Sequence, residues 1–244
     1  MKILTNLDYD NIDDLSDIFR KGTPRPSIVI NDFFKADIIE SLNDECQNSD
    51  DSNWKVFNRN GSHMVEYNNI QKLPKAYEAY SYLHSGPFLK WLERLTNING
   101  LIPDPHLIGA GYSKSFNGDT LKVHVDFNWN NDLKLYRALS LIVYLTPDWE
   151  EEWGGGLDFY DGERTKIVKT VPCLYNTCSI FKYDELGFHG YATPIKCPEG
   201  KSRNSIRAFY YVSNEEYKKD FTPHRSLYWF DEETKKPFDK KHEI

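Results

Sequence analysis

The sequence predicts a mainly β domain with an α-helical cap. From about residue 105 onward, short apolar or alternating runs are separated by Pro, Gly, Asn and Asp, without intervening helical patterns. Such runs are typical of a sandwich, jelly roll or barrel. Before that point, apolar residues recur mainly at helical spacing. Aromatic residues make up 15% of the chain, a share that favours a β-rich core and excludes a disordered chain.

Length and charge exclude several classes of protein. The 244 residues can bury one sizeable core. The net charge of −7 argues against a nucleic-acid partner, which would need a basic face. We expect no membrane partner, because no run approaches the roughly 18 apolar residues of a span. The four cysteines lack metal or disulfide spacing and the start lacks a signal peptide pattern, so we expect a cytoplasmic protein of undetermined oligomeric state.

Residues 1–104 are expected to form an N-terminal helical and strand cap that packs on the core. A short strand is predicted over 27–34 (SIVINDFF), and a weak one at 63–67 (HMVEY). A helix over 35–49 would present one apolar face, made of Ile38, Ile39, Leu42 and Cys46.

Two further helices are predicted before residue 104. Pro74 suits the first position of a helix, and Gly86-Pro87 ends that helix and starts another. Asn99-Gly100 is expected to close the second helix. The buried side of that helix should carry Phe88, Trp91, Leu92 and Leu95.

Residues 105–213 are expected to form the β core. LSLIVYL (139–145) is a nearly continuous apolar run, as expected of a strand buried on both faces. Further strands are predicted in GGGLDFYD, TKIVKTV, TCSIFKY and SIRAFYYV. Residues 214–244 are expected to form a polar C-terminal extension. The simplest interpretation is one integrated domain, large enough for an enzyme, that includes the cap and the core.

A His-x-Asp pair is the first sign of chemistry. His124 and Asp126 would project from the same face of a strand, where both can reach one ion. Two histidines and one carboxylate leave three positions of an octahedron open, as in non-haem Fe(II) oxygenases. The pair alone is weak support, because seven histidines and 37 acidic residues give about one such pair by chance. A surface or core-edge histidine is the alternative.

His189, in LGFHGYATP, can supply the missing ligand. It follows the predicted strand TCSIFKY and a short turn, which places it on a different strand from His124. In isolation, a loop histidine beside a glycine is the commoner interpretation. The other histidines lack a paired context, and we expect them to be ordinary surface or packing residues: His63, His84, His106, His224 and His242.

An arginine near the start of the last core strand can bind a carboxylate. Arg203 and Ser205 share a strand face and can hold one carboxylate, the arginine through its bidentate fork. A surface ion pair is the alternative for Arg203. Arg207 lies on the same face and is a rival anchor, whereas Lys122 and Arg137 flank the His-x-Asp pair without a comparable partner.

The order of these signals resembles a known family, the Fe(II)- and 2-oxoglutarate-dependent dioxygenases of the prolyl 4-hydroxylase type, which includes the oxygen-sensing and ribosomal prolyl hydroxylases. The resemblance runs from about 108 to 212 and is carried by GYSKSFNGDTLKVHVD, RALSLIVYLTPDW, EEWGGGLDFYD, FHGYATP and RNSIRAFYY. It implies a double-stranded β-helix, a jelly-roll variant, with iron at its open end.

The resemblance also assigns roles to residues of this chain. His124, Asp126 and His189 match the family's catalytic metal ligands. Arg203 matches the residue that grips the distal carboxylate of 2-oxoglutarate, with Ser205 completing an Arg-x-Ser pattern. Two tyrosines match co-substrate and pocket positions, namely Tyr144 and Tyr112. The loop PIKCPEGKS lengthens the interval before Arg203, which leaves the choice between Arg203 and Arg207 open.

The implied reaction consumes 2-oxoglutarate and O2, releases succinate and CO2, and hydroxylates a substrate, with ascorbate expected to maintain Fe(II). The implied substrate is a prolyl residue in a proline-containing peptide or protein, and the carbon hydroxylated (C3 or C4) is not determined by the sequence. Trp129 and the acidic tract 148–153 are candidates to line the substrate rim. Alternatives are a hydroxylase of free proline or another small amino acid, an inactive β-helix binding module, and a cupin-like metal protein.

Overall fold

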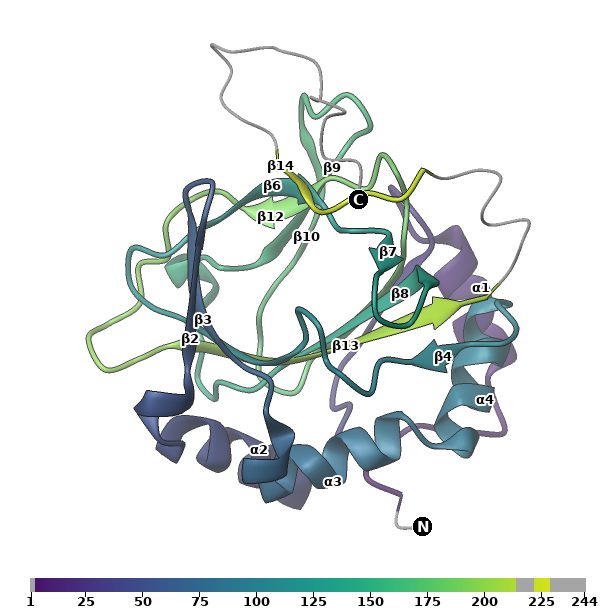
Figure 1. Ribbon diagram of the computed structural model, residues 1–244, viewed down its shortest axis with the longest axis horizontal. Helices are drawn as coiled ribbons and strands as arrows, with labels where there is room; N and C mark the ends of the chain where they lie inside the picture. The colour runs from purple at the N-terminus through teal and green to yellow at the C-terminus, as the bar shows by residue number, and fades with distance from the viewer. Residues whose placement is uncertain (1–2, 214–221, 229–244) are drawn as a thin grey trace.

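The computed structural model describes residues 3–213 and 222–228. Its core is a pair of sheets whose strands pair in antiparallel fashion (Figure 1). This jelly-roll-like architecture confirms the predicted fold class, a mainly β core with helices packed outside it.

The larger sheet has nine strands. Seven form a continuous path, which in spatial order is β1 (Ser27–Ile30), β11 (Cys178–Lys182), β8 (Leu135–Tyr144), β13 (Arg203–Val212), β5 (Gly111–Ser115), β3 (Ser62–Tyr67) and β2 (Lys55–Arg59). Two short strands lie off this path: β4 (Ile102–Pro103) pairs with β13, and β7 (Trp129–Asn130) pairs with β8.

The smaller sheet has five strands. In spatial order they are β10 (Ile167–Val171), β9 (Leu157–Tyr160), β12 (His189–Tyr191), β6 (Leu121–Val125) and β14 (Leu227–Tyr228). Buried aromatic and aliphatic side chains from both sheets fill the space between them, among them Tyr144, Phe159, Phe181 and Tyr191. The two sheets therefore enclose a core of their own.

Four helices are described: α1 (Asp13–Lys21), α2 (Ala36–Asn48), α3 (Pro74–Leu83) and α4 (Gly86–Thr96). Helices α2, α3 and α4 lie on the side of the larger sheet that faces away from the smaller one (Figure 1). The Tyr80 hydroxyl of α3 donates to the Arg207 carbonyl and accepts from the Gly111 N–H at 3.0 Å, which ties the helices to β13 and β5. No described helix is long and apolar enough to cross a membrane.

The apolar patterns of the helices set their orientation. The buried residues of α2 are Ile38, Ile39, Leu42 and Cys46, as predicted. Helix α4 buries the predicted face; it begins after Ser85, whose hydroxyl accepts from the Phe88 N–H. It ends earlier than expected, because Asn97 adopts a left-handed conformation with φ 55°.

The segment 1–104 forms more than a cap. It supplies the four helices and also β1, β2, β3 and β4 of the larger sheet. The domain boundary between residues 104 and 105 therefore remains a prediction. The main hydrophobic core contains residues from both sides of that boundary. Most of the predicted extension 214–244 lies outside the described residues.

Candidate active site

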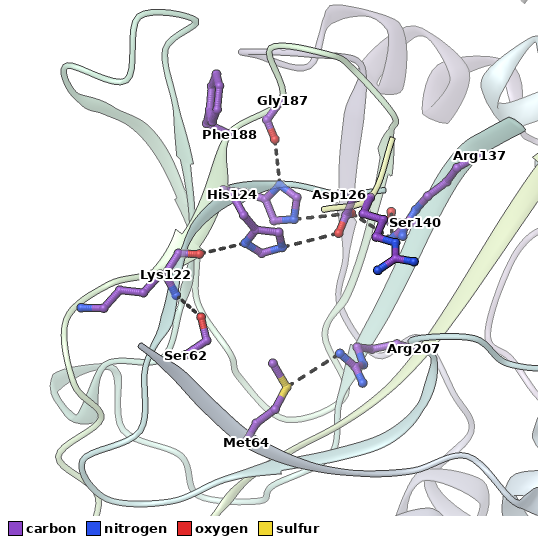
Figure 2. A network of polar contacts seen from close by, with 12 residues as sticks. Ser62, Met64, Lys122, His124, Asp126, Arg137, Ser140, Gly187, Phe188 and Arg207 are labelled. Carbon is purple, nitrogen blue, oxygen red and sulfur yellow. Dashed lines mark hydrogen bonds and ion pairs between the residues drawn. The ribbon is translucent and has the colours of Figure 1, made fainter. Parts of the chain in front are cut away.

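The two predicted histidines face each other across neighbouring strands. His124 lies near the end of β6 and His189 begins β12, and the two residues are directly paired in the antiparallel register. Asp126 follows β6 immediately. The Nε2 atoms of His124 and His189 each lie 3.5 Å from an Asp126 carboxylate oxygen, and one ligand atom from each of the three residues lies within 4.8 Å of the others. The structure thus brings the three residues together, and Figure 2 shows His124 and Asp126 of this cluster.

Backbone carbonyls orient both imidazole rings. The Nδ1 atom of His124 lies 2.9 Å from the Lys122 carbonyl, and that of His189 lies 2.8 Å from the Gly187 carbonyl. Because a carbonyl only accepts, Nδ1 must carry the hydrogen in both rings, which leaves the Nε2 lone pairs directed at the shared space.

Arg25 fixes the turn that carries His189. This buried arginine lies ahead of β1 and donates to the Gly187 carbonyl at 2.7 Å and to the Phe188 carbonyl at 3.2 Å. Gly187 has no side chain to obstruct this contact, since a Cβ there would lie 1.9 Å from Arg25 Nη1. No sequence pattern pointed to Arg25.

Arg137 is a second residue that sequence reasoning missed. It lies on β8 and its Nη2 pairs with Asp126 at 2.8 Å, while the same atom donates to Ser140 at 2.9 Å. The Phe209 ring centre lies 3.5 Å from its guanidinium carbon. The expectation that Arg137 lacks a partner was wrong. The available signal was a charged residue within a mostly apolar run, which requires a buried counterion.

These charges determine the ionisation of the site. Burial alone would raise the pKa of Asp126, but Arg137 and the two histidines outweigh burial and hold that pKa well below its ordinary range. Burial lowers the pKa of His189 below its ordinary value, against the opposing effect of Asp126. At neutral pH the carboxylate is therefore charged and His189 is neutral, which are the forms that bind metals.

A cavity of about 220 Å³ opens beside the three residues. Arg203 and Ser205 of β13 line it together with them. Arg203 is 5% exposed, its Nε donates to the Gly155 carbonyl at 2.6 Å, and no carboxylate among residues 3–213 and 222–228 pairs with it. Ser205 shares a 2.8 Å hydrogen bond with Ser113. The cavity therefore has a buried cation in its wall.

Tyr144 lies against Arg203 rather than on the cavity surface. The Arg203 guanidinium carbon is 4.8 Å from the ring centre of Tyr144 and 4.7 Å from that of Tyr191. The Tyr144 hydroxyl is buried and has no hydrogen-bond partner among the described residues. Burial raises its pKa above the ordinary value, so the group remains a donor.

Arg207, the alternative anchor for the 2-oxoglutarate carboxylate, already has a carboxylate partner in the protein. It also lines the cavity, but its Nη2 lies 2.5 Å from a Glu66 carboxylate oxygen and its Nη1 lies 3.8 Å from the Met64 sulfur (Figure 2). A carboxylate ligand entering the cavity would meet an unpaired cation at Arg203 and a paired one at Arg207.

Tyr112, expected in the pocket, and the rim candidates Trp129 and 148–153 do not line this cavity. Tyr112 does not line the cavity; the alternation of β5 turns it toward α2, where its hydroxyl donates to Leu42 O and Glu45 at 3.2 and 3.1 Å. Trp129 packs against Tyr136 with ring centres 4.7 Å apart. The acidic tract 148–153 is likewise absent from the cavity lining. The alternation of side chains along β5 explains the position of Tyr112, because its neighbour Ser113 faces the cavity.

The residues present fit both an iron ion and a 2-oxo dicarboxylate. Two imidazole nitrogens and one carboxylate oxygen form a donor set typical of non-haem Fe(II). The guanidinium of Arg203 lines the cavity and has no carboxylate partner among the described residues, so a bound carboxylate would satisfy it.

Residues 110–211 match the family model of the 2OG-Fe(II) oxygenase superfamily. These residues form a 2OG-Fe(II) oxygenase domain. The prolyl 3-hydroxylase OGFOD1 of Xenopus laevis is 25% identical to the chain over 199 residues, which cover 78% of this chain and 35% of that protein. The chain thus spans about a third of the length of this curated relative.

Two solved structures share the fold of the oxygenase domain. One is a prolyl hydroxylase of Trichoplax adhaerens in complex with a peptide fragment of hypoxia inducible factor, with a TM-score of 0.56, 18% identity, and coverage of 81% of this chain and 89% of that one. The other is HygX of Streptomyces hygroscopicus with nickel, 2-oxoglutarate and hygromycin B, with a TM-score of 0.55, 12% identity, and coverage of 82% and 87%.

Proposed function

We propose that the chain is an Fe(II)- and 2-oxoglutarate-dependent dioxygenase that hydroxylates a prolyl residue in a peptide or protein. The observation that carries the proposal is a two-histidine, one-carboxylate cluster in the same cavity wall as an unpaired buried arginine. The similarity to OGFOD1 and to a peptide-binding prolyl hydroxylase supports the substrate class.

The proposed roles follow from the geometry. His124, Asp126 and His189 would hold iron, and Arg203 would bind the distal carboxylate of 2-oxoglutarate, with Ser205 as a further donor. The Tyr144 ring would support the Arg203 guanidinium. Iron and 2-oxoglutarate, when bound, supply the oxidation: O2 is consumed, succinate and CO2 are released, and one oxygen atom enters the substrate. The chain contributes fixed ligands, an oriented co-substrate and a partly closed cavity.

Two finer assignments belong to the same proposal. Ascorbate should support turnover by keeping the iron in the ferrous state, as the resemblance implies. All four cysteines are free and buried, which supports a reducing, cytoplasmic location.

One assay tests the proposal. The iron-loaded protein is incubated with 2-oxoglutarate and a panel of proline-containing peptides, with free proline alongside, and both succinate and product mass are measured. We expect succinate formation coupled to the gain of one oxygen atom on a prolyl residue of a peptide. Coupled turnover of free proline alone would contradict the polypeptide assignment, and absence of 2-oxoglutarate turnover with every substrate would contradict the enzyme class.

A further inference from the structure

A short segment near the C-terminus lies next to the three candidate metal ligands. Residues 222–228 end in β14, which lies along the free edge of β6 (Figure 1). In this pairing Leu227 lies opposite Val125 and Tyr228 lies opposite His124. Ser226 and Tyr228 line the same cavity as the three candidate ligands.

Asn128 holds this segment against the core. Its side-chain amide donates to the Thr222 carbonyl at 2.8 Å and to Glu185 at 2.9 Å, and its Oδ1 accepts from the His224 N–H at 2.8 Å. The His224 ring lies 3.1 Å from Glu185 and 3.0 Å from the Tyr183 hydroxyl. Asn128 is 1% exposed. Because both ends of its amide are engaged, the position of the segment is specified by the core.

The Tyr228 ring lies in the cavity wall next to His124. It stacks on the His124 imidazole with ring centres 5.1 Å apart and an interplanar angle of 20°. Arg59 and Glu66 of the β2–β3 hairpin and Arg207 of β13 line the same cavity as Tyr228. Tyr228 is half-buried, and it lies on an edge strand of the smaller sheet, away from the strand positions of Arg203 and Tyr144.

We propose that Tyr228 determines substrate specificity as the aromatic wall against which the prolyl ring of the substrate lies. This inference rests on the proposed function. Its support is the position of the ring, beside a candidate metal ligand yet apart from the arginine that suits the co-substrate. An aromatic face attracts the polarised C–H groups of a saturated ring next to an amide nitrogen. The Asn128 contacts hold the wall in place before substrate arrives, which limits the entropy lost on binding.

The experiment compares two peptides of one sequence, one with proline and one with N-methylalanine at the target position. Their Kd values are measured on the full chain loaded with nickel and N-oxalylglycine, and their kcat/KM values on the iron-loaded enzyme. Tyr228→Ala should weaken the prolyl peptide about fivefold to tenfold and weaken the N-methylalanyl peptide less. Tyr228→Phe should preserve the preference, and Tyr77→Ala, at a 57% exposed tyrosine of α3, should leave both peptides unaffected.

The His224 contacts that hold residues 222–228 in place provide a second variant. His224→Ala should reduce the preference for the prolyl peptide in the same direction, and combining it with Tyr228→Ala should add little, because both act through one segment. A general folding defect would weaken both peptides equally. An unchanged ratio of Kd values in Tyr228→Ala, or tighter binding of the prolyl peptide, would overturn this inference while the wild type still hydroxylates proline. Failure of the wild type to hydroxylate any prolyl peptide would overturn the proposed function itself.

Discussion

Arg203 and Arg207 share a face of β13 and differ in their partners. Arg207 is paired with Glu66, whereas Arg203 has no carboxylate partner among residues 3–213 and 222–228 and lies against the Gly155 carbonyl and two aromatic rings. We predict that Arg203→Ala weakens 2-oxoglutarate binding by on the order of 2–5 kcal/mol, and that Arg207→Ala has a much smaller effect. Calorimetry of the nickel-loaded protein measures both. The reverse ranking would show that Arg207 is the anchor.

Arg137 should act on the metal through Asp126. Replacing it with glutamine removes the guanidinium that pairs with the carboxylate at 2.8 Å. Loss of such an outer partner typically lowers metal affinity about 10–100-fold, which competition with a chelator would measure. Arg20→Gln is a matched control, because Arg20 is an exposed arginine of α1. Equal metal affinity in the two variants would refute the role of Arg137.

At the scale of elements, the end of α3 packs against β13 through a half-buried histidine. His84 lies between Tyr80 and Tyr210, and burial lowers its pKa from 6.5 to about 4. Because the folded pKa is depressed, the neutral ring stabilises the fold fully above pH 6.5. This contribution is lost as the pH falls from 6.5 toward 4, with a total of about 3 kcal/mol.

The prediction is tested by urea unfolding at pH 7.5 and pH 4.5. Wild type should lose more stability over this range than His84→Phe, since the variant has no proton to gain at this position. Carboxylates titrate in both proteins, so the difference between the two isolates His84. A pH-independent difference in the free energy of unfolding would contradict the packing described for His84.

Sequence patterns predicted the elements that bury a regular apolar face. Helices α2 and α4 and strand β8 are of this kind. Helix α1 was missed because its only buried residue is Phe19, and β2 because KVFNR is a polar edge strand without buried residues. Their positions depend on tertiary contacts, which local periodicity does not report.

At the scale of the whole molecule, the site combines segments that are distant in sequence. The three ligand candidates were found from spacing and resemblance, and the structure brings them together. The contacts of Arg25, Arg137 and Tyr228 were not predicted, since each is made only after the sheets have paired. Tyr112 was misplaced because a resemblance in sequence does not fix which face of a strand a residue occupies.

Because the cluster joins β6 to β12, metal binding should stabilise the whole fold. A ligand at about 100 times its Kd adds about 2.7 kcal/mol to the free energy of unfolding. We therefore expect nickel to raise the urea midpoint of the wild type and to have little effect on that of Asp126→Ala. Comparing each protein with and without nickel removes the destabilisation caused by leaving Arg137 unpaired. An equal nickel-induced shift in both proteins would exclude Asp126 as a ligand.

The most direct test of the central claim is an anaerobic titration of the Fe(II)-loaded protein with 2-oxoglutarate. The visible charge-transfer absorption of a 2-oxo acid chelated to Fe(II) is recorded. Wild type should develop this absorption and saturate at one equivalent of 2-oxoglutarate. Asp126→Ala should not develop it, and Arg203→Ala should need about 100-fold more 2-oxoglutarate. Absence of the absorption in the wild type, or its full retention in Asp126→Ala, would contradict the assignment of this site.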